Sequence, residues 1–222
     1  MTLIYLSHVL DVSTPAYGDS RSLEIENLRS IARGHSCNES AVRLPLHLGS
    51  HADSPFHFDE HGPTIDHYEP DFWFVRSVSL IDVPAGPGDV VDLDRFEDVS
   101  PCIPRDCEAI LIRTGAERLR WSEPETYATN GPYLGDDLAR HLRENFDIRF
   151  LGVDSISISS PAHRDVGRSS HRDLLCLGSK APVVVLEDLS LGGLQESPKE
   201  MWIFPLRIRG ADGAPITVVA RL

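Results

Sequence analysis

The stretch His47-Leu48-Gly49-Ser50-His51-Ala52-Asp53-Ser54-Pro55-Phe56-His57 carries three histidines and one carboxylate at positions of equal parity. In an extended strand, residues of equal parity share one face, so these four side chains could converge on one point. A helix would turn Asp53 away from His47 and His51, and Pro55 would interrupt it. Gly49 has no side chain and would leave room on the same face. The stretch therefore predicts an extended, sheet-type segment with a polar site on one face.

The polar groups of this stretch favour a metal site. Imidazole nitrogen together with carboxylate oxygen suits Zn, Mn or Fe, whereas Mg and Ca prefer shells made of oxygen alone. A single histidine is more often a surface residue or a hydrogen-bonded core residue than a ligand. Four groups in this register, with Gly, Asp and Pro interleaved, make a solvated histidine-rich loop the weaker explanation.

The same run resembles the His-x-Gly-Thr-His-x-Asp-x-Pro-x-His signature of the bacterial kynurenine formamidase and cyclase family of metal-dependent hydrolases, with Ser50 in place of Thr. The resemblance implies that His47, His51 and Asp53 are metal ligands, with Asp53 bridging two ions. It implies that His57 is the general acid/base. It also implies an α/β fold of the swivelling β/β/α type and a homodimer or homotetramer.

Other segments extend this resemblance along the chain. The segment 10–19 is similar to the family's opening segment, in which an aromatic residue lines the substrate pocket, and Tyr17 takes that place here. Phe56, Phe72 and Trp73 are further candidates for holding an aryl group by stacking. The segments 109–115, 151–155 and 213–215 are also similar to family segments.

The second half of a two-metal site requires a distant histidine and carboxylate. The resemblance points to His171, which opens His-Arg-Asp-Leu-Leu, and to Glu187, which follows an apolar run. The segment between them is about one helical turn longer than the formamidases lead us to expect, so His163 is the alternative to His171. Ser155, Ser157 and Ser159 alternate and could face the site, although small residues at a strand edge are the simpler explanation.

Composition and periodicity predict one mixed α/β domain over residues 1–222. Hydrophobic residues make up 41% of the chain, enough for a sizeable core. Leucines at positions 134, 138 and 142 predict an amphipathic helix packed on a sheet. The segments 84–88 and 210–215 read as turns, the second with Asp-Gly joining two strands. Short apolar runs rich in β-branched residues predict strands at 75–83, 109–114, 150–154, 183–186 and 217–220.

Charge and missing motifs exclude several classes of function. A net charge of −13 disfavours nucleic acids and anionic membranes as partners. The sequence has no Gly-x-Ser-x-Gly elbow, no phosphate loop of the Gly-x-x-x-x-Gly-Lys type and no Gly-x-Gly-x-x-Gly. The four cysteines form no Cys-x-x-Cys pair, and no segment resembles a signal peptide. We therefore expect reduced cysteines and a cytoplasmic enzyme.

Together, the residues and the resemblance predict a metal-dependent hydrolase that cleaves a small aryl-linked formamide of the N-formylkynurenine type. The expected cofactor is a divalent metal, Zn with Mn as the alternative, at two ions per subunit. Two other readings stay open. The first is opening of a lactam or lactone, as in isatin hydrolases, or a polyketide-type cyclisation within the same family. The second is a metal-stabilised binding protein without turnover, which would not need His57.

Overall fold

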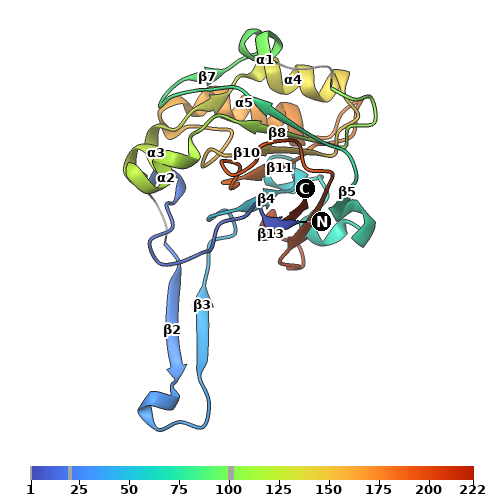
Figure 1. Ribbon diagram of the computed structural model, residues 1–222. Helices are drawn as coiled ribbons and strands as arrows, with labels where there is room; N and C mark the ends of the chain where they lie inside the picture. The colour runs from blue at the N-terminus through green and yellow to red at the C-terminus, as the bar shows by residue number, and fades with distance from the viewer. Residues whose placement is uncertain (1, 20–21, 100–102) are drawn as a thin grey trace.

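A nine-stranded mixed sheet forms the centre of the protein (Figure 1). The computed structural model describes residues 2–19, 22–99 and 103–222. Along the sheet the strand order is β5-β12-β13-β4-β11-β10-β8-β6, and β1 pairs with β13. The strands are β1 (Leu3–Tyr5), β4 (His51–Asp53), β5 (Phe74–Val75), β6 (Val78–Asp82), β8 (Ala109–Arg113), β10 (Phe150–Val153), β11 (Val184–Glu187), β12 (Glu200–Pro205) and β13 (Gly213–Arg221). This arrangement confirms the predicted mixed α/β fold.

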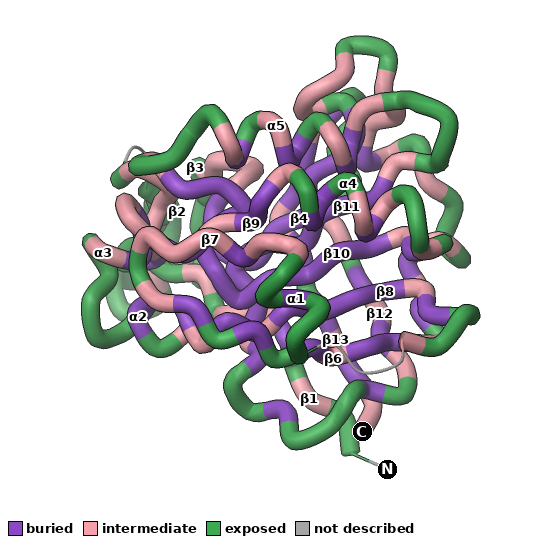
Figure 2. Tube along the Cα trace, turned by 90° about the horizontal axis from the view of Figure 1, so that it is seen from above, coloured by how far each residue is buried: buried purple, intermediate pink, exposed green. Residues whose placement is uncertain are grey.

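The parallel half of the sheet consists of β6, β8, β10 and β11. Its strands are short runs of Val, Ile and Leu because both of their faces are covered. Helices α4 (Asp136–Asn145) and α5 (Arg164–Leu175) pack against each other on one face, where Leu138 and Leu142 are fully buried. Figure 2 shows the buried strands beneath these more exposed outer segments. Leu138 and Leu142 lie on a helix as predicted, whereas Leu134 lies in the short strand β9 (Tyr133–Leu134) ahead of it.

Two predicted segments differ in the structure. The apolar run 75–83 contains two strands, because β5 pairs with β12 whereas β6 pairs with β8. The segment 210–215 is only partly a turn. Residues Gly213–Pro215 begin β13 and pair antiparallel with β4, with Gly213 opposite Asp53 and Pro215 opposite His51. The backbone hydrogen-bonding demand of the buried strand β4 outweighs the local turn preference of this segment.

A two-stranded hairpin projects from the body of the protein (Figure 1). It consists of β2 (Glu24–Arg29) and β3 (Glu39–Arg43), and every residue of both strands is exposed. The sequence analysis did not identify this hairpin. The other strand is β7 (Val90–Val91), which pairs with β9, and the other α-helices are α1 (Leu93–Val99), α2 (Glu117–Ser122) and α3 (Pro124–Asn130). Among the described residues, no helix has the length and apolar character that a membrane span requires.

Candidate metal centre and active site

The histidine-rich stretch forms three different local structures, so the predicted single extended segment is wrong. Only His51–Asp53 form a strand. His47 lies in the turn before it, where Gly49 has a φ of 68° and where an added Cβ would lie 2.1 Å from the Leu10 side chain. Gly49 therefore permits a left-handed turn and close packing, and its role is not to leave room for an ion. His57 ends the 3-10 helix η3 (Pro55–His57). The four side chains still converge, by way of a turn, a strand and a helical turn.

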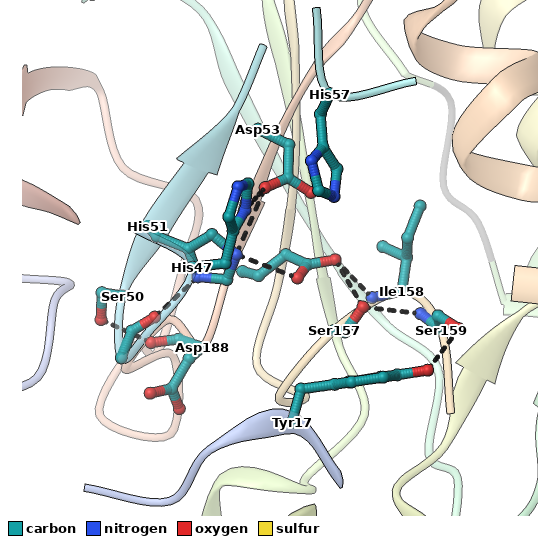
Figure 3. Close-up of polar contacts among 12 residues, drawn as sticks. Tyr17, His47, Ser50, His51, Asp53, His57, Ser157, Ile158, Ser159 and Asp188 are labelled. Carbon is teal, nitrogen blue, oxygen red and sulfur yellow. Dashed lines mark hydrogen bonds and ion pairs between the residues drawn. The ribbon is translucent and has the colours of Figure 1, made fainter. Parts of the chain in front are cut away.

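His47, His51 and Asp53 form the first group that could hold a metal ion. The Nδ1 of His47 lies 2.7 Å from Oδ1 of Asp53, and the Nε2 of His51 lies 3.3 Å from the same oxygen (Figure 3). Asp53 is 1% exposed and His51 is 3% exposed. A carboxylate this deeply buried requires a compensating charge or ion.

Asp53, His171 and Glu187 form the second group. The Nε2 of His171 lies 3.5 Å from Oδ2 of Asp53 and 3.4 Å from Oε1 of Glu187. Oε2 of Glu187 lies 3.2 Å from the Nε2 of His51. The structure thus brings the two distant residues to the motif, because β11 pairs with β4 and α5 contacts β11 in the middle of the sheet. Asp53 belongs to both groups.

The orientation of the buried histidines fits metal ligation. His51 donates its Nδ1–H to the carbonyl of Gly49 at 2.8 Å, and His171 donates its Nδ1–H to the carbonyl of Gly167 at 2.7 Å. These bonds direct both Nε2 atoms toward the carboxylates. Metal-binding histidines are typically oriented by such an outer hydrogen bond, which also sets the tautomer. The donor set of imidazoles and carboxylates is one that divalent transition metals prefer.

The same groups shift one another's pKa values. Burial by itself would lower the pKa of His47 and of His171, but the neighbouring carboxylates raise these pKa values to about 9 and about 10. Burial and the Asp53 charge oppose ionisation of Glu187, yet hydrogen bonds from His171 and His51 lower its pKa to about 2. Burial also opposes ionisation of Asp53, whose pKa the histidines nevertheless hold well below its usual value. The carboxylates are therefore ionised, and without metal the histidines supply the compensating positive charge.

Asp212 is a site residue that the sequence analysis missed. Its Oδ2 accepts hydrogen bonds from the Nδ1 of His57 at 3.0 Å and from the Nε2 of His47 at 2.9 Å. These two bonds lower the pKa of Asp212 far below its usual value. Ser54 donates its backbone N–H and its hydroxyl to the Asp212 carbonyl, which joins this residue to the motif. His47, His57 and Asp212 form a further group of possible metal ligands.

The carboxylate of Glu187 also accepts hydrogen bonds from outside the group of possible metal ligands. Its Oε1 accepts hydrogen bonds from the hydroxyl of Ser157 and from the backbone N–H of Ile158, both at 2.8 Å (Figure 3). Ser157 and Ser159 therefore face the site, whereas the Ser155 hydroxyl bonds the carbonyl of Ser157. A Cβ added to Gly167 would lie 2.6 Å from the Cα of Ser159, so α5 can approach this serine segment only with glycine there.

A pocket of about 460 Å³ opens onto the two groups. Tyr17 lines it from the 3-10 helix η1 (Tyr17–Asp19), and its hydroxyl lies 2.9 Å from the hydroxyl of Ser159. Phe58 also lines it and stacks on His171 at a centroid distance of 4.7 Å.

The other candidates lie elsewhere. Phe56, Phe72 and Trp73 do not line this pocket, and Phe72 and Trp73 pack with the hydrophobic core instead. His163 stacks on Tyr133, 4.6 Å away, so His171 rather than His163 joins the centre.

Comparisons with known proteins identify relatives of this chain. The Cyclase family model, described as "Putative cyclase", matches residues 4–160. A "Cyclase-like protein 2" of Oryza sativa subsp. japonica is 27% identical, over 98% of this chain and 78% of that protein. A "Kynurenine formamidase" of Geobacillus thermodenitrificans is 25% identical, over 98% of this chain and 96% of that protein.

Solved structures share the fold. Isatin hydrolase A from Labrenzia aggregata, bound to benzyl benzoate, superposes with a TM-score of 0.82 at 22% identity and covers 99% of this chain and 93% of its own. These relatives confirm the resemblance drawn from the histidine-rich motif and the expected class of enzyme. The chain belongs to the Cyclase family.

Proposed function

We propose that the protein is a metal-dependent hydrolase that cleaves a small aryl-linked amide of the N-formylkynurenine type. One observation carries this proposal. Asp53 belongs to both ligand groups, and in each group the possible ligand atoms lie within 4.8 Å of one another. A shared carboxylate between two such groups is the arrangement expected for two neighbouring ions.

His47, His51 and Asp53 would hold one ion, and Asp53, His171 and Glu187 would hold the other. When bound, divalent ions such as Zn, or Mn as the alternative, would acidify a water toward a pKa of about 7 and polarise the amide carbonyl. The hydrogen bonds from Ser157 and Ile158 fix the Glu187 carboxylate in place for this role.

His57 would act as the general acid/base. Its Nδ1–H is donated to Asp212, so its Nε2 is the ring nitrogen left to exchange a proton in the pocket. Imidazole can both accept and donate a proton near neutral pH. His57 would deliver a proton to the leaving nitrogen, so that the formamide and water become formate and an aromatic amine.

The pocket wall fits an aromatic group. Tyr17 and Phe58 offer two aromatic rings against which the aryl part of a substrate would stack. The Tyr17 hydroxyl, beside Ser159, places a polar group on this wall. Lactam opening, with isatin as its test substrate, is the second candidate function, because isatin hydrolase A shares the fold of this chain.

The test is hydrolysis of N-formylkynurenine and of isatin by the purified protein, with Zn or Mn supplied and with a chelator in parallel. We expect turnover of N-formylkynurenine that the chelator abolishes. Turnover of isatin alone would transfer the assignment to lactam opening. Turnover of neither compound with either metal would overturn both assignments.

A further inference from the structure

Helix α5 presents two arginines to the same pocket as His171. Arg164 and Arg168 precede His171 by seven and three residues, a spacing that places all three on one face of the helix. All three line the pocket. At 1.5 Å per residue, the two arginines lie about 10 Å and about 5 Å from His171 along the helix axis. The arginines therefore mark the outer part of a cavity whose inner part is the metal centre.

These arginines give the outer pocket a charge opposite to that of the protein as a whole. The chain has a net charge of −13. Among the described residues that line the pocket, the acidic ones are Asp53 and Glu187, both in the metal centre, whereas Arg164 and Arg168 are the arginines and no lysine is present. Such a local positive field attracts anions to a cavity and raises their local concentration.

Both guanidinium groups are available to a ligand. Within the described ranges, the guanidinium of Arg164 forms no ion pair, which means that no carboxylate oxygen lies within 4.0 Å of its nitrogens. Arg168 has one such neighbour, Asp165, at 3.8 Å, and both side chains of that pair are exposed. An exposed pair of this length contributes little and is readily exchanged.

Arg164 lies next to the turn that carries Tyr17, one of the two aromatic residues of the pocket wall. A Cβ added to Gly18 would lie 3.7 Å from Nη2 of Arg164, so the guanidinium lies against the turn that carries Tyr17. A ring stacked on Tyr17, with its amide directed to the metal centre, would present its far edge to Arg164. Guanidinium groups bind carboxylates with paired hydrogen bonds.

We infer that Arg164 and Arg168 form an anion-binding subsite that selects aryl amides carrying a carboxylate on the side of the ring remote from the scissile bond. This inference rests on the proposed hydrolase function and goes beyond it, because the carboxylate of N-formylkynurenine lies on a side chain at the ring position next to the formamide rather than on the far edge of the ring. The subsite distinguishes anionic substrates from neutral anilides and neutral lactams of similar size.

The experiment compares 4-formamidobenzoate with formanilide, which differ by the carboxylate, in the metal-loaded wild-type protein and in the double variant R164Q/R168Q. In the wild type we expect kcat/KM to be about tenfold higher for 4-formamidobenzoate, mainly through a lower KM. In the double variant this preference should fall to near unity. Arg172→Gln, on the same helix and outside the pocket lining, is the matched control and should keep the preference.

A binding measurement separates this inference from the proposed function. Isothermal titration of the product 4-aminobenzoate should give binding to the wild type and to Arg172→Gln, with about tenfold weaker binding to R164Q/R168Q. Equal kcat/KM for the two substrates in the wild type, or an unchanged preference in the double variant, would overturn the subsite. Absence of turnover with both formamides would overturn the hydrolase function, and the titration would then still decide whether the arginines bind the anion.

Discussion

The centre around β4 and the β2–β3 hairpin are adjacent in the chain and depart from the usual burial of side chains in opposite ways. The centre buries ionisable side chains, whereas the hairpin exposes apolar ones. In β4, His51 and Asp53 are 3% and 1% exposed. In the hairpin, the cross-strand neighbours Ile25 and Val42 are 48% and 58% exposed. Ionisable groups are rarely buried unless paired, and grouped exposed apolar residues often mark contact surfaces. We therefore expect both regions to be completed by a partner, the centre by ions and the hairpin by a covering surface.

The largest expected effect comes from the carboxylate shared by both ligand groups. Asp53→Asn should lower kcat by about 10³-fold or more and reduce the bound metal, because the neutral amide is a poor replacement for a bridging carboxylate. Steady-state kinetics and metal analysis by mass spectrometry measure both effects. Glu26→Gln removes an exposed carboxylate from the hairpin and serves as the matched control. Full activity of Asp53→Asn would contradict the shared-ligand assignment.

Replacing His57 should separate proton transfer from metal binding. His57→Ala should lower kcat by about 10²- to 10⁴-fold, because a general acid/base is lost, while the metal content stays at the wild-type level. His57, His47 and Asp212 could also hold an ion together, which makes the measurement decisive. Loss of metal from this variant would identify His57 as a ligand.

Asp212→Asn should have a smaller effect. The amide keeps a hydrogen-bonding group beside His57 but removes the charge that orients both His57 and His47. We expect kcat to fall about tenfold with a smaller change in KM, because an orienting group contributes less than the proton-transferring group itself. An unchanged kcat would show that Asp212 does not position the catalytic histidine.

The hairpin should affect assembly rather than chemistry. An isolated two-stranded sheet is marginally stable in water. We propose that a second copy of the chain covers the face that carries Ile25 and Val42, which agrees with the homodimer or homotetramer that the family resemblance implies. I25K/V42K should lower the mass measured by light scattering, whereas A41K, at the neighbouring position in β3, should not. An oligomer unaffected by I25K/V42K would overturn this role.

The smallest effect concerns the stability of the metal-free protein against pH. The pKa values of His47 and His171 are raised to about 9 and about 10, so their charged forms stabilise the fold fully below the usual pKa of 6.5. This stabilisation is lost as the pH rises through 9 and 10. In the presence of a chelator, the unfolding temperature should therefore fall by a few degrees between about pH 7 and pH 10. The metal-loaded protein should not show this fall, and a flat profile without metal would contradict the assigned charges.

Local pattern was sufficient to predict three of the buried strands and the motif. The apolar runs at 109–114, 150–154 and 183–186 are strands because they are buried on both faces, and the composition of each run shows this directly. The equal parity of His51 and Asp53 also predicted that both side chains lie on one face of a strand. The convergence of His47 and His57 has another cause, namely the left-handed turn at Gly49 and the 3-10 helix at Pro55.

Contacts between distant segments could not be predicted in the same way. Asp212 reaches the site because β13 pairs with β4, and its local sequence, Gly-Ala-Asp-Gly, indicates only a turn. The strands of the hairpin are exposed on both sides, so no burial pattern marked them. Arg164 and Arg168 gain their significance from the position of α5 above the centre.

If two ions share Asp53, the metal content of the protein should report both of them. Protein reconstituted with Zn and freed of excess metal should contain about two ions per chain, and Glu187→Gln should reduce this to about one, because His47, His51 and Asp53 remain. That result would support two sites joined by one carboxylate. A wild-type content near zero, or a content of about two that Glu187→Gln leaves unchanged, would show that Asp53 and Glu187 do not hold a second ion.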